Sequence, residues 1–285
     1  MTTAHEDKLK GGIAVITGAG SGIGSGLARR AGQLGMTVIV TDICTASATR
    51  VCQEIISAGG KAEAITVDVS VPSNLEKLAE TVFTKHGSVR LLVNNAGIET
   101  LGFIWEIPEA RWEAALNINV HGVIHSVRAF VPRMLTSGVE CWIANLSSIG
   151  AFGMMPTQAA YMLTKHAVQS FTEALFLELQ LKKAPIHVSS VMPGMVKTGI
   201  FAAEGGVGEP EGAARYRTAM REMMSNYGMD LDEGCKLIME QVAAGKFWVS
   251  TQPEMTSEVL AGRAAFLTGQ RDPEIAETAR HLLGG

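Results

Sequence analysis

The feature of this chain that most constrains its fold is an alternation of short apolar runs with longer stretches of helical periodicity. The runs are continuously apolar rather than alternating between apolar and polar residues, which is typical of strands covered on both faces. Seven of them occur, at residues 12–17, 36–41, 62–67, 89–94, 141–146, 186–191 and 246–250. Strands that alternate with helices form a parallel sheet with right-handed crossovers. We therefore predict a doubly wound, seven-stranded α/β fold with helices on both faces of the sheet.

The spacing of these runs continues from residue 12 to about residue 193 without a linker or repeat, and it loosens afterwards. We predict a single domain over residues 1–285. Residues 195–245 are expected to be an insertion over the sheet that acts as a substrate-binding lid, because ligands of such sheets bind at the carboxyl ends of the strands. Residues 250–285 are expected to be a C-terminal extension.

Composition excludes several classes of protein. Hydrophobic residues make up 47% of the chain and charged ones 18%, with a net charge of −4, so a large core is expected and a basic nucleic-acid-binding surface is not. No run approaches 18 apolar residues and the N-terminus lacks an apolar signal segment, so we predict a cytoplasmic protein without a membrane span. The four cysteines are scattered, which indicates free thiols rather than a metal site or disulfides.

A glycine-rich segment, VITGAGSGIG at residues 15–24, follows the first apolar run. Thr17, Gly18, Gly22 and Gly24 give the spacing T-G-x-x-x-G-x-G, and no choice of glycines here gives the commoner G-x-G-x-x-G. Glycines between a strand and a helix let the backbone turn tightly and approach a pyrophosphate, whose charge is favoured by the free amides of the helix N-terminus. A glycine cluster alone is more often a simple turn, so its position after the first strand is what indicates a dinucleotide site.

Asp42 ends the second apolar run, 18 residues after Gly24. A carboxylate there accepts hydrogen bonds from the adenosine ribose hydroxyls and repels a 2′-phosphate. Ser21 and Ile43 are uncharged, and Arg50 is the nearby guanidinium that could compensate. The sequence therefore favours NAD over NADP as the coenzyme, while a helix N-cap is the purely structural interpretation of Asp42.

Tyr161 and Lys165 lie four residues apart in YMLTK, shortly after the fifth apolar run. On a helix these positions share a face, so both side chains are expected to point into one cleft. A phenol has a pKa near 10, and bringing it to neutrality requires roughly 4 kcal/mol of stabilisation of the phenolate. A cation about 4 Å away supplies about 4 kcal/mol at an effective dielectric constant of 20. The pair therefore predicts a tyrosine that exchanges protons, whereas an ordinary helix surface is the structural alternative.

Five motifs occur in order: the glycine turn, LLVNNAGIET (91–100), Ser148, YMLTK (161–165) and VMPGMVKT (191–198). With these motifs the chain resembles the short-chain dehydrogenase/reductase family, over about residues 11–200 and on toward the last strand near residue 250. The resemblance implies a Rossmann-like fold and an NAD(P)-dependent oxidoreductase that interconverts a secondary alcohol and a ketone by hydride transfer.

The resemblance also implies roles for the matching residues. Tyr161 would be the acid/base, Lys165 its electrostatic partner and Ser148 the hydroxyl that orients the carbonyl. Asn119, which has the Asn-x-x-Gly spacing that Asn117 lacks, would support a water near the lysine. The residues implied to bind the coenzyme are Thr17, Gly18, Ser21, Gly22, Ile23, Gly24, Asp42, Asp68, Val69, Asn94, Ala96, Gly97, Tyr161, Lys165, Pro193, Gly194, Val196 and Thr198.

Seven of the 14 methionines fall within residues 192–239, and two more follow Ser148. Flexible thioether side chains suit adaptable binding surfaces, although packing of a lid against the sheet explains them equally well. We predict a roomy apolar pocket for a bulky, apolar or aromatic alcohol or ketone. The predicted substrate contacts are Met154, Met155, Phe201 and Tyr227.

Two rival functions are considered. A related epimerase or dehydratase would show a different glycine spacing and a longer substrate domain. A coenzyme-sensing binding protein without turnover would lack part of the Ser, Tyr, Lys and Asn set, which is complete here. As partners, the resemblance implies a small-molecule substrate and other copies of the chain, in a homodimer or homotetramer.

Overall fold

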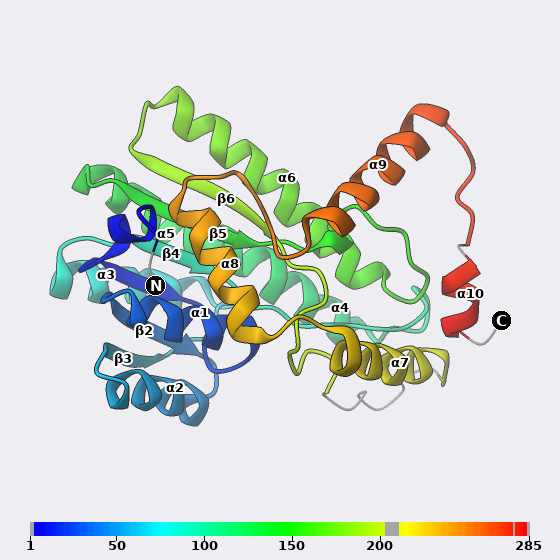
Figure 1. The fold of residues 1–285 in the computed structure, drawn as a ribbon, viewed down its shortest axis with the longest axis horizontal. Coiled ribbons are helices and arrows are strands. Elements are labelled where there is room, and N and C mark those ends of the chain that lie inside the picture. The colour runs from blue at the N-terminus through cyan, green and yellow to red at the C-terminus, as the bar shows by residue number, and fades with distance from the viewer. Residues whose placement is uncertain (1–2, 203–210, 276, 284–285) are drawn as a thin grey trace.

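The core of the protein is a seven-stranded parallel sheet with the strand order β3-β2-β1-β4-β5-β6-β7 (Figure 1). The computed structural model describes residues 3–202, 211–275 and 277–283. The strands are β1 (Ile13–Ile16), β2 (Thr37–Asp42), β3 (Lys61–Thr66), β4 (Leu91–Asn94), β5 (Cys141–Leu146), β6 (Ile186–Met192) and β7 (Trp248–Ser250). Each lies within one of the apolar runs or overlaps it closely, so the predicted doubly wound α/β fold is confirmed.

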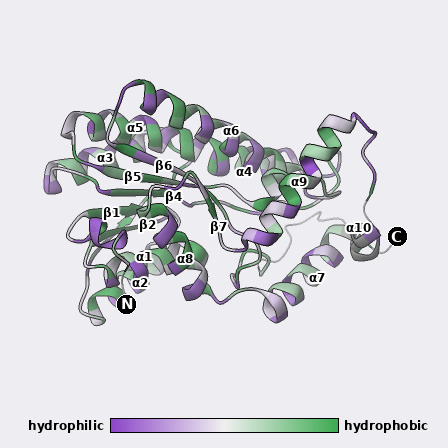
Figure 2. Ribbon diagram, turned by 45° about the horizontal axis from the view of Figure 1, so that its top comes forward, coloured by the Kyte–Doolittle hydropathy of each residue, from purple (hydrophilic) through white to green (hydrophobic). Residues whose placement is uncertain are grey.

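Helices cover both faces of the sheet, as the view in Figure 2 shows with their apolar sides toward the strands. One face carries α1 (Gly22–Gln33), α2 (Thr45–Ser57) and α8 (Leu231–Ala243), whose apolar residues form one buried cluster with the strands. The other face carries α3 (Pro72–His86), α5 (Gly122–Ser137) and α6 (Ala159–Leu181), which form a second cluster. Because the strands between them face apolar layers on both sides, their sequences are apolar throughout.

The edge strand β3 is less buried than the central strands, because apolar layers do not cover it in the same way. All residues of the central strand β5 are buried, whereas β3, at one edge, has exposed and half-buried residues only. The central strands are therefore the most firmly packed part of the sheet. The helices described next lie beyond their carboxyl ends.

Three helices lie beyond the carboxyl ends of the strands: α7 (Glu211–Tyr227), α9 (Pro253–Gly269) and α10 (Glu277–Leu283). The predicted lid, residues 195–245, is divided between two places, because α8 packs against α1 in the layer that covers the sheet. There a Cβ on Gly26 would be 2.4 Å from the Cys235 sulfur, so the two helices are in direct contact. Within the predicted lid, α7 lies at the strand ends, and residues 203–210 are outside the described residues. A role of this region as a lid stays a prediction, as does the role of the extension that α9 and α10 form.

On the other face, α4 (Glu109–Leu116) runs into α5 through five residues of π-helix, Asn117–His121 (η2). None of the helices in the described part of the chain is long and apolar enough to cross a membrane.

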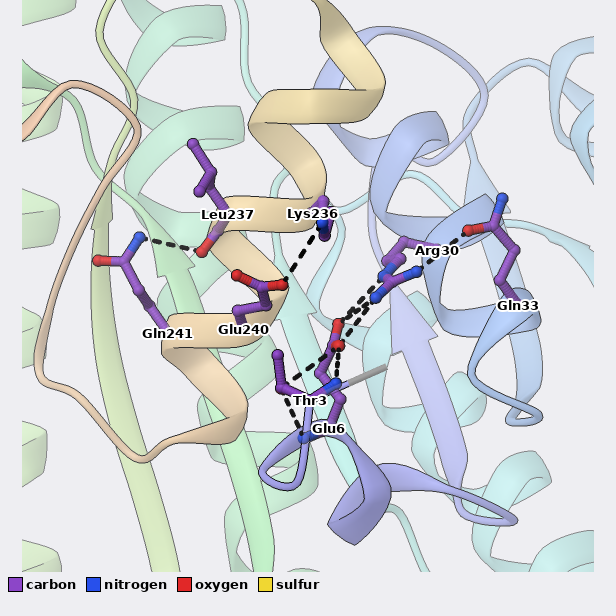
Figure 3. Close-up of polar contacts among 8 residues, drawn as sticks. All are labelled: Thr3, Glu6, Arg30, Gln33, Lys236, Leu237, Glu240 and Gln241. Carbon is purple, nitrogen blue, oxygen red and sulfur yellow. Dashed lines mark hydrogen bonds and ion pairs between the residues drawn. The ribbon is translucent and has the colours of Figure 1, made fainter. Parts of the chain in front are cut away.

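The N-terminal segment is fastened to α1 by a buried ion pair (Figure 3). Glu6, in the 3₁₀ turn η1 (Glu6–Leu9), is fully buried, and the guanidinium of Arg30 donates to both of its carboxylate oxygens at 2.7 and 2.8 Å. The backbone N–H of Thr3 donates to the same carboxylate at 3.0 Å. A buried carboxylate requires such partners, because water cannot replace them.

We expect Arg30→Ala to lower the free energy of unfolding by about 3–5 kcal/mol, since it leaves a buried carboxylate without its counter-ion. Arg29→Ala is the matched control: Arg29 pairs with Glu54 and Asp232 on the surface, and its loss is expected to cost less than about 1 kcal/mol. Urea unfolding followed by circular dichroism measures both. Equal effects of the two substitutions would contradict the importance of the Glu6 pair.

Candidate active site

A cavity of about 1100 Å³ opens at the carboxyl ends of the strands. Its walls come from the segments that follow β1, β2, β3, β4, β5 and β6, and from the helices α4, α6, α7 and α9. This is where doubly wound sheets bind their ligands, because the loops after successive parallel strands meet at one edge. The glycine turn and Asp42 line one end of the cavity. Ser148, Tyr161 and residues of α7 line the other end.

The glycine turn is packed so closely that only glycine fits at two of its positions. Gly18 has a φ of +61°, and a Cβ there would be 2.8 Å from the Ala96 Cα. A Cβ on Gly24 would be 2.3 Å from the Gly18 carbonyl oxygen and 2.4 Å from the side-chain nitrogen of Asn95. The turn therefore presents backbone rather than side chains at the N-terminus of α1, which suits a pyrophosphate.

Asn95, which sequence reasoning did not single out, fixes the turn from the next strand. Its Nδ2 donates to the carbonyl oxygens of Thr17 and Gly18 at 2.9 and 3.0 Å, and its N–H donates to the Thr17 hydroxyl. Asn94, by contrast, donates to Asn145 on β5 at 2.8 Å and is not among the residues that line the cavity. Successive residues of a strand point to opposite sides, so the adjacent asparagine is the one that reaches the turn.

Asp42 is held at the edge of the cavity by two backbone amides. Gly20 N–H donates to Oδ2 and Cys44 N–H donates to Oδ1, each at 2.9 Å. Arg50, the compensating cation considered above, is engaged elsewhere: it donates to the Gly20 carbonyl oxygen at 2.8 Å and pairs with Glu54. The carboxylate is therefore fixed in orientation, and the nearby guanidinium is already used.

Most of the residues assigned to the coenzyme by resemblance lie together around this cavity. Thr17 and Gly24 form the interior of the turn instead of lining the cavity. The assigned residues that line the cavity are Gly18, Ser21, Gly22, Ile23, Asp42, Asp68, Val69, Ala96, Gly97, Tyr161, Lys165, Pro193, Gly194, Val196 and Thr198. Their fit to a dinucleotide rests on the turn that excludes side chains and on the fixed carboxylate of Asp42.

The proposed catalytic side chains converge at the other end of the cavity. Tyr161 and Lys165 occupy one face of α6, with the Lys165 ammonium 5.5 Å from the centre of the Tyr161 ring. The ammonium donates to the Leu146 carbonyl oxygen, at the end of β5, at 2.7 Å. Ser148 lies two residues after the end of the same strand, and its hydroxyl accepts the Gly150 N–H at 3.0 Å, so it caps a 3₁₀ turn and also lines the cavity.

Asn119 lies beside this group without lining the cavity. Its side chain accepts the Ile98 N–H at 2.8 Å, and it donates to the Ile98 carbonyl oxygen at 2.9 Å and to the Thr164 hydroxyl at 3.0 Å. The residue thus ties the loop after β4 to α6. Its predicted role in supporting a water stays a prediction.

Burial changes the acidity of the pair in a way that the sequence estimate did not include. Desolvation raises the pKa of the Tyr161 phenol above its usual value, and the charge of Glu99 raises it further, while a hydrogen bond with Ser148 lowers it. Desolvation also lowers the pKa of Lys165 to about 8. The prediction from sequence counted the attraction of the cation and left out the cost of burying both groups, so it placed the pKa of Tyr161 too low.

Glu99 is the main residue of the cavity that the sequence reasoning missed. It lies two residues after Gly97, is 7% exposed, and lines the cavity. Burial raises the pKa of its carboxyl to about 8, against weaker opposing effects of the Thr100 backbone, Arg217 and Lys165. A glutamate two residues after the NNAG segment was its only signal in the sequence.

The predicted substrate contacts are divided. Met154, Met155 and Phe201 line the cavity, whereas the side chain of Tyr227, at the end of α7, is 76% exposed and does not. Sequence reasoning placed Tyr227 in the pocket because its helical phase relative to the sheet was unknown. Polar residues that it did not foresee also line this end: Arg111, Tyr216 and Arg217.

Comparison with known proteins places this arrangement in a family. The family model described as "short chain dehydrogenase" matches residues 12–205. A 1-deoxy-11-beta-hydroxypentalenate dehydrogenase of Streptomyces avermitilis is 29% identical over 248 residues, which is 86% of each chain. A cyclohexanol dehydrogenase of Acinetobacter sp. is 34% identical over 205 residues, covering 71% of this chain and 80% of that one.

Solved structures agree. A short chain dehydrogenase/reductase from Burkholderia phymatum in complex with NAD has a TM-score of 0.89 at 29% identity, covering 94% of this chain and 98% of that one. A metagenomic short-chain oxidoreductase in complex with NADP has a TM-score of 0.62 at 33% identity, covering 66% of this chain and 85% of that one. The chain belongs to the short-chain dehydrogenase/reductase family. It is an oxidoreductase of that family, whose members bind a nicotinamide coenzyme and act on small molecules.

The raised pKa of Glu99 predicts a pH-dependent stability. Between about pH 5 and 8 the folded protein keeps this proton while the unfolded chain loses it, so the free energy of unfolding falls as pH rises. The difference between about 8 and the ordinary 4.5 is about 3.5 in pKa, which corresponds to an upper bound of about 5 kcal/mol. We expect Glu99→Gln to remove this decline, measured by urea unfolding at pH 5, 6.5 and 8.

The exposed Glu106, on the same loop, gives the control Glu106→Gln, which is expected to follow the unaltered protein. Lys165 stays protonated over most of this range in both states, so its opposite effect begins only near pH 8. A Glu99→Gln variant that declines as steeply as the unaltered protein would show that another group is responsible.

Proposed function

We propose that this protein interconverts a secondary alcohol and a ketone of bulky, largely apolar skeleton, with NAD as coenzyme and Tyr161 as the acid/base. The observation that carries the proposal is the meeting of Ser148, Tyr161 and Lys165 in the same cavity as the glycine turn and Asp42. A dinucleotide bound at the turn and a substrate beside the phenol would share one cavity.

The chemistry divides between the coenzyme and the chain. When bound, the nicotinamide accepts a hydride in oxidation and gives one in reduction. Tyr161 takes the alcohol proton in oxidation and donates a proton to the forming alkoxide in reduction. Ser148 hydrogen-bonds the same substrate oxygen and stabilises the charge that develops on it.

Lys165 orients the acid/base and favours its ionised form. Its ammonium donates a hydrogen bond to the Leu146 carbonyl oxygen, and this bond holds the positive charge near the phenol instead of letting it turn toward solvent. Because burial raises the pKa of the Tyr161 phenol, the phenol is protonated at neutral pH and suited to act as the acid. Oxidation requires its ionised form, so the rate of alcohol oxidation is expected to rise with pH.

The preference for NAD rests on Asp42. Its carboxylate is oriented by the Gly20 and Cys44 amides at the cavity edge, and Arg50 is engaged by Glu54 and the Gly20 carbonyl oxygen. A 2′-phosphate in this place would meet a fixed negative charge without a free cation beside it.

Family members assemble in various ways, and a homodimer or homotetramer in the cytoplasm remains our expectation for this chain.

Tyr161→Phe tests the acid/base assignment. We expect kcat for alcohol oxidation to fall by about 10²-fold or more, because the proton acceptor is removed while the ring and its packing stay. The assay follows absorbance at 340 nm with NAD and cyclohexanol. Thermal stability is expected to stay near that of the unaltered protein, and coenzyme binding, measured by fluorescence titration, is expected to weaken only slightly, because Tyr161 is one of many residues assigned to the coenzyme.

Tyr227→Phe is the matched control, since the exposed Tyr227 ring lies outside the cavity lining. It is expected to retain full activity, and it also tests the assignment of Tyr227 to the substrate made from sequence. Near-normal turnover of a folded Tyr161→Phe variant would end the proposal.

Coenzyme preference is tested by comparing kcat/KM for NAD and NADP. We expect kcat/KM to be at least about tenfold higher with NAD than with NADP. NADP would lose the ribose hydrogen bonds to Asp42, and the carboxylate would repel its 2′-phosphate. Asp42→Ser is expected to narrow that ratio mainly by weakening NAD. A preference of the unaltered protein for NADP would overturn this part of the proposal and leave the acid/base assignment untouched.

A further inference from the structure

Glu99 is a buried carboxyl for which the hydride-transfer chemistry has no use. It is 7% exposed, and its Oε1 has neither contact with solvent nor a hydrogen-bond partner among the described residues. A buried polar atom without a partner is destabilising, and such groups persist where a function requires them. Since Glu99 lines the cavity, and rotation about its last side-chain bond is soft, a molecule in the cavity can supply the missing partner.

The position of this carboxyl is set by a rigid backbone. The preceding residue, Ile98, is held through both its N–H and its carbonyl oxygen by the side chain of Asn119, at 2.8 and 2.9 Å. The following residue, Thr100, is fully buried. Asn119 also donates to Thr164 on α6, so one amide joins the loop that carries Glu99 to the helix that carries Tyr161. A group fixed in this way suits recognition of a defined atom of a ligand.

The carboxyl lies at the reacting end of the cavity, not at the Asp42 end. A Cβ on Gly97, two residues before Glu99, would be 3.7 Å from the Lys165 ammonium nitrogen. The charge of Glu99 is also near enough to raise the pKa values of both Tyr161 and Tyr216. Whatever pairs with Glu99 is therefore close to the carbon that exchanges hydride.

The charges around Glu99 decide which chemical group this is. Facing it are Lys165 and Tyr161 from α6 and Tyr216 and Arg217 from α7, and Arg111 from α4 lines the same cavity. Three cations in these walls disfavour a ligand that carries an ammonium group. The burial that raises the pKa of Glu99 to about 8 keeps it neutral at pH 7, and a neutral carboxyl both donates and accepts. A hydroxyl or carbonyl oxygen matches that capacity.

We propose that Glu99 determines substrate specificity by hydrogen-bonding a second oxygen of the substrate, a hydroxyl or carbonyl on a carbon near the reacting one. The substrate class is then diols, hydroxyketones or diketones on a largely apolar skeleton, rather than simple mono-alcohols. The inference rests on the proposed hydride transfer at this site. It adds a polar contact to a pocket that the sequence predicted as apolar.

The test compares cyclohexanol with the 1,2-, 1,3- and 1,4-cyclohexanediols, using NAD and absorbance at 340 nm. In the unaltered protein we expect kcat/KM for at least one diol to exceed that for cyclohexanol by about tenfold to hundredfold. Glu99→Leu is expected to abolish this preference through loss of activity on the diol, while cyclohexanol is oxidised at least as well. Glu99→Gln, which still donates and accepts, is expected to retain part of it. Glu106→Gln, on the exposed part of the same loop, is expected to keep the full preference.

Three results would overturn the inference. They are equal kcat/KM for cyclohexanol and every diol in the unaltered protein, a diol preference that survives Glu99→Leu, and a preference for 2-aminocyclohexanol over the diols. The last would mean that Glu99 acts as an anion toward a cationic substrate.

Stability separates this role from a structural one. Glu99→Leu, and Glu99→Met as a second apolar variant of similar length, are expected to melt at or above the temperature of the unaltered protein at pH 8, because they remove a buried carboxyl whose Oε1 has no hydrogen-bond partner among the described residues. A fall in melting temperature for both would show that Glu99 supports the fold, and would overturn the proposal.

Failure of hydride transfer itself is recognised separately. Where neither cyclohexanol nor any diol is oxidised, the proposed function fails, and ligand-observed NMR with the coenzyme-free protein decides the present inference. At least fivefold tighter binding of a diol than of cyclohexanol, lost in Glu99→Leu, would support it. Equal binding in the unaltered protein would overturn it.

Discussion

The arrangement of the active site depends on how the start of α6 is fastened to the end of β5. The Lys165 ammonium donates to the Leu146 carbonyl oxygen at 2.7 Å, and the Ser147 hydroxyl donates in the other direction, to the Lys165 carbonyl oxygen, at 3.2 Å. The strand is buried along its whole length, so its end is a fixed point. Tyr161, one helical turn before Lys165, takes its place in the cavity from these two bonds.

The same close packing that fixes these groups makes them costly. Tyr161, Lys165 and Glu99 have pKa values shifted toward the neutral form, because each is removed from water. Three such groups facing one cavity lower the free energy of unfolding. Their presence is explained by a bound molecule that completes their interactions. The two apolar layers over the sheet supply the stability that allows this.

Elements whose pattern repeats could be predicted well from the sequence. The seven strands, the glycine turn and the Tyr161–Lys165 pair all follow from local periodicity or fixed spacing, and the structure has them at the expected residues. Features that depend on the direction in which a side chain points were harder to predict. Asn94 and Asn95 are equivalent in sequence, yet only Asn95 reaches the turn. Tyr227 ends a helix whose inner face carries Tyr216 and Met224, and its ring is exposed.

The sequence by itself determined the class of fold and the family, because continuous apolar strands and close-fitting glycines are requirements of single segments and are visible in each segment alone. Tertiary structure decided the acidity of Tyr161 and Lys165 and the presence of Glu99, Arg111 and Arg217 in the cavity lining. These groups come from loops and helices far apart in the chain, and desolvation and electrostatic interaction depend on their distances in space. Spacing along a sequence does not contain those distances.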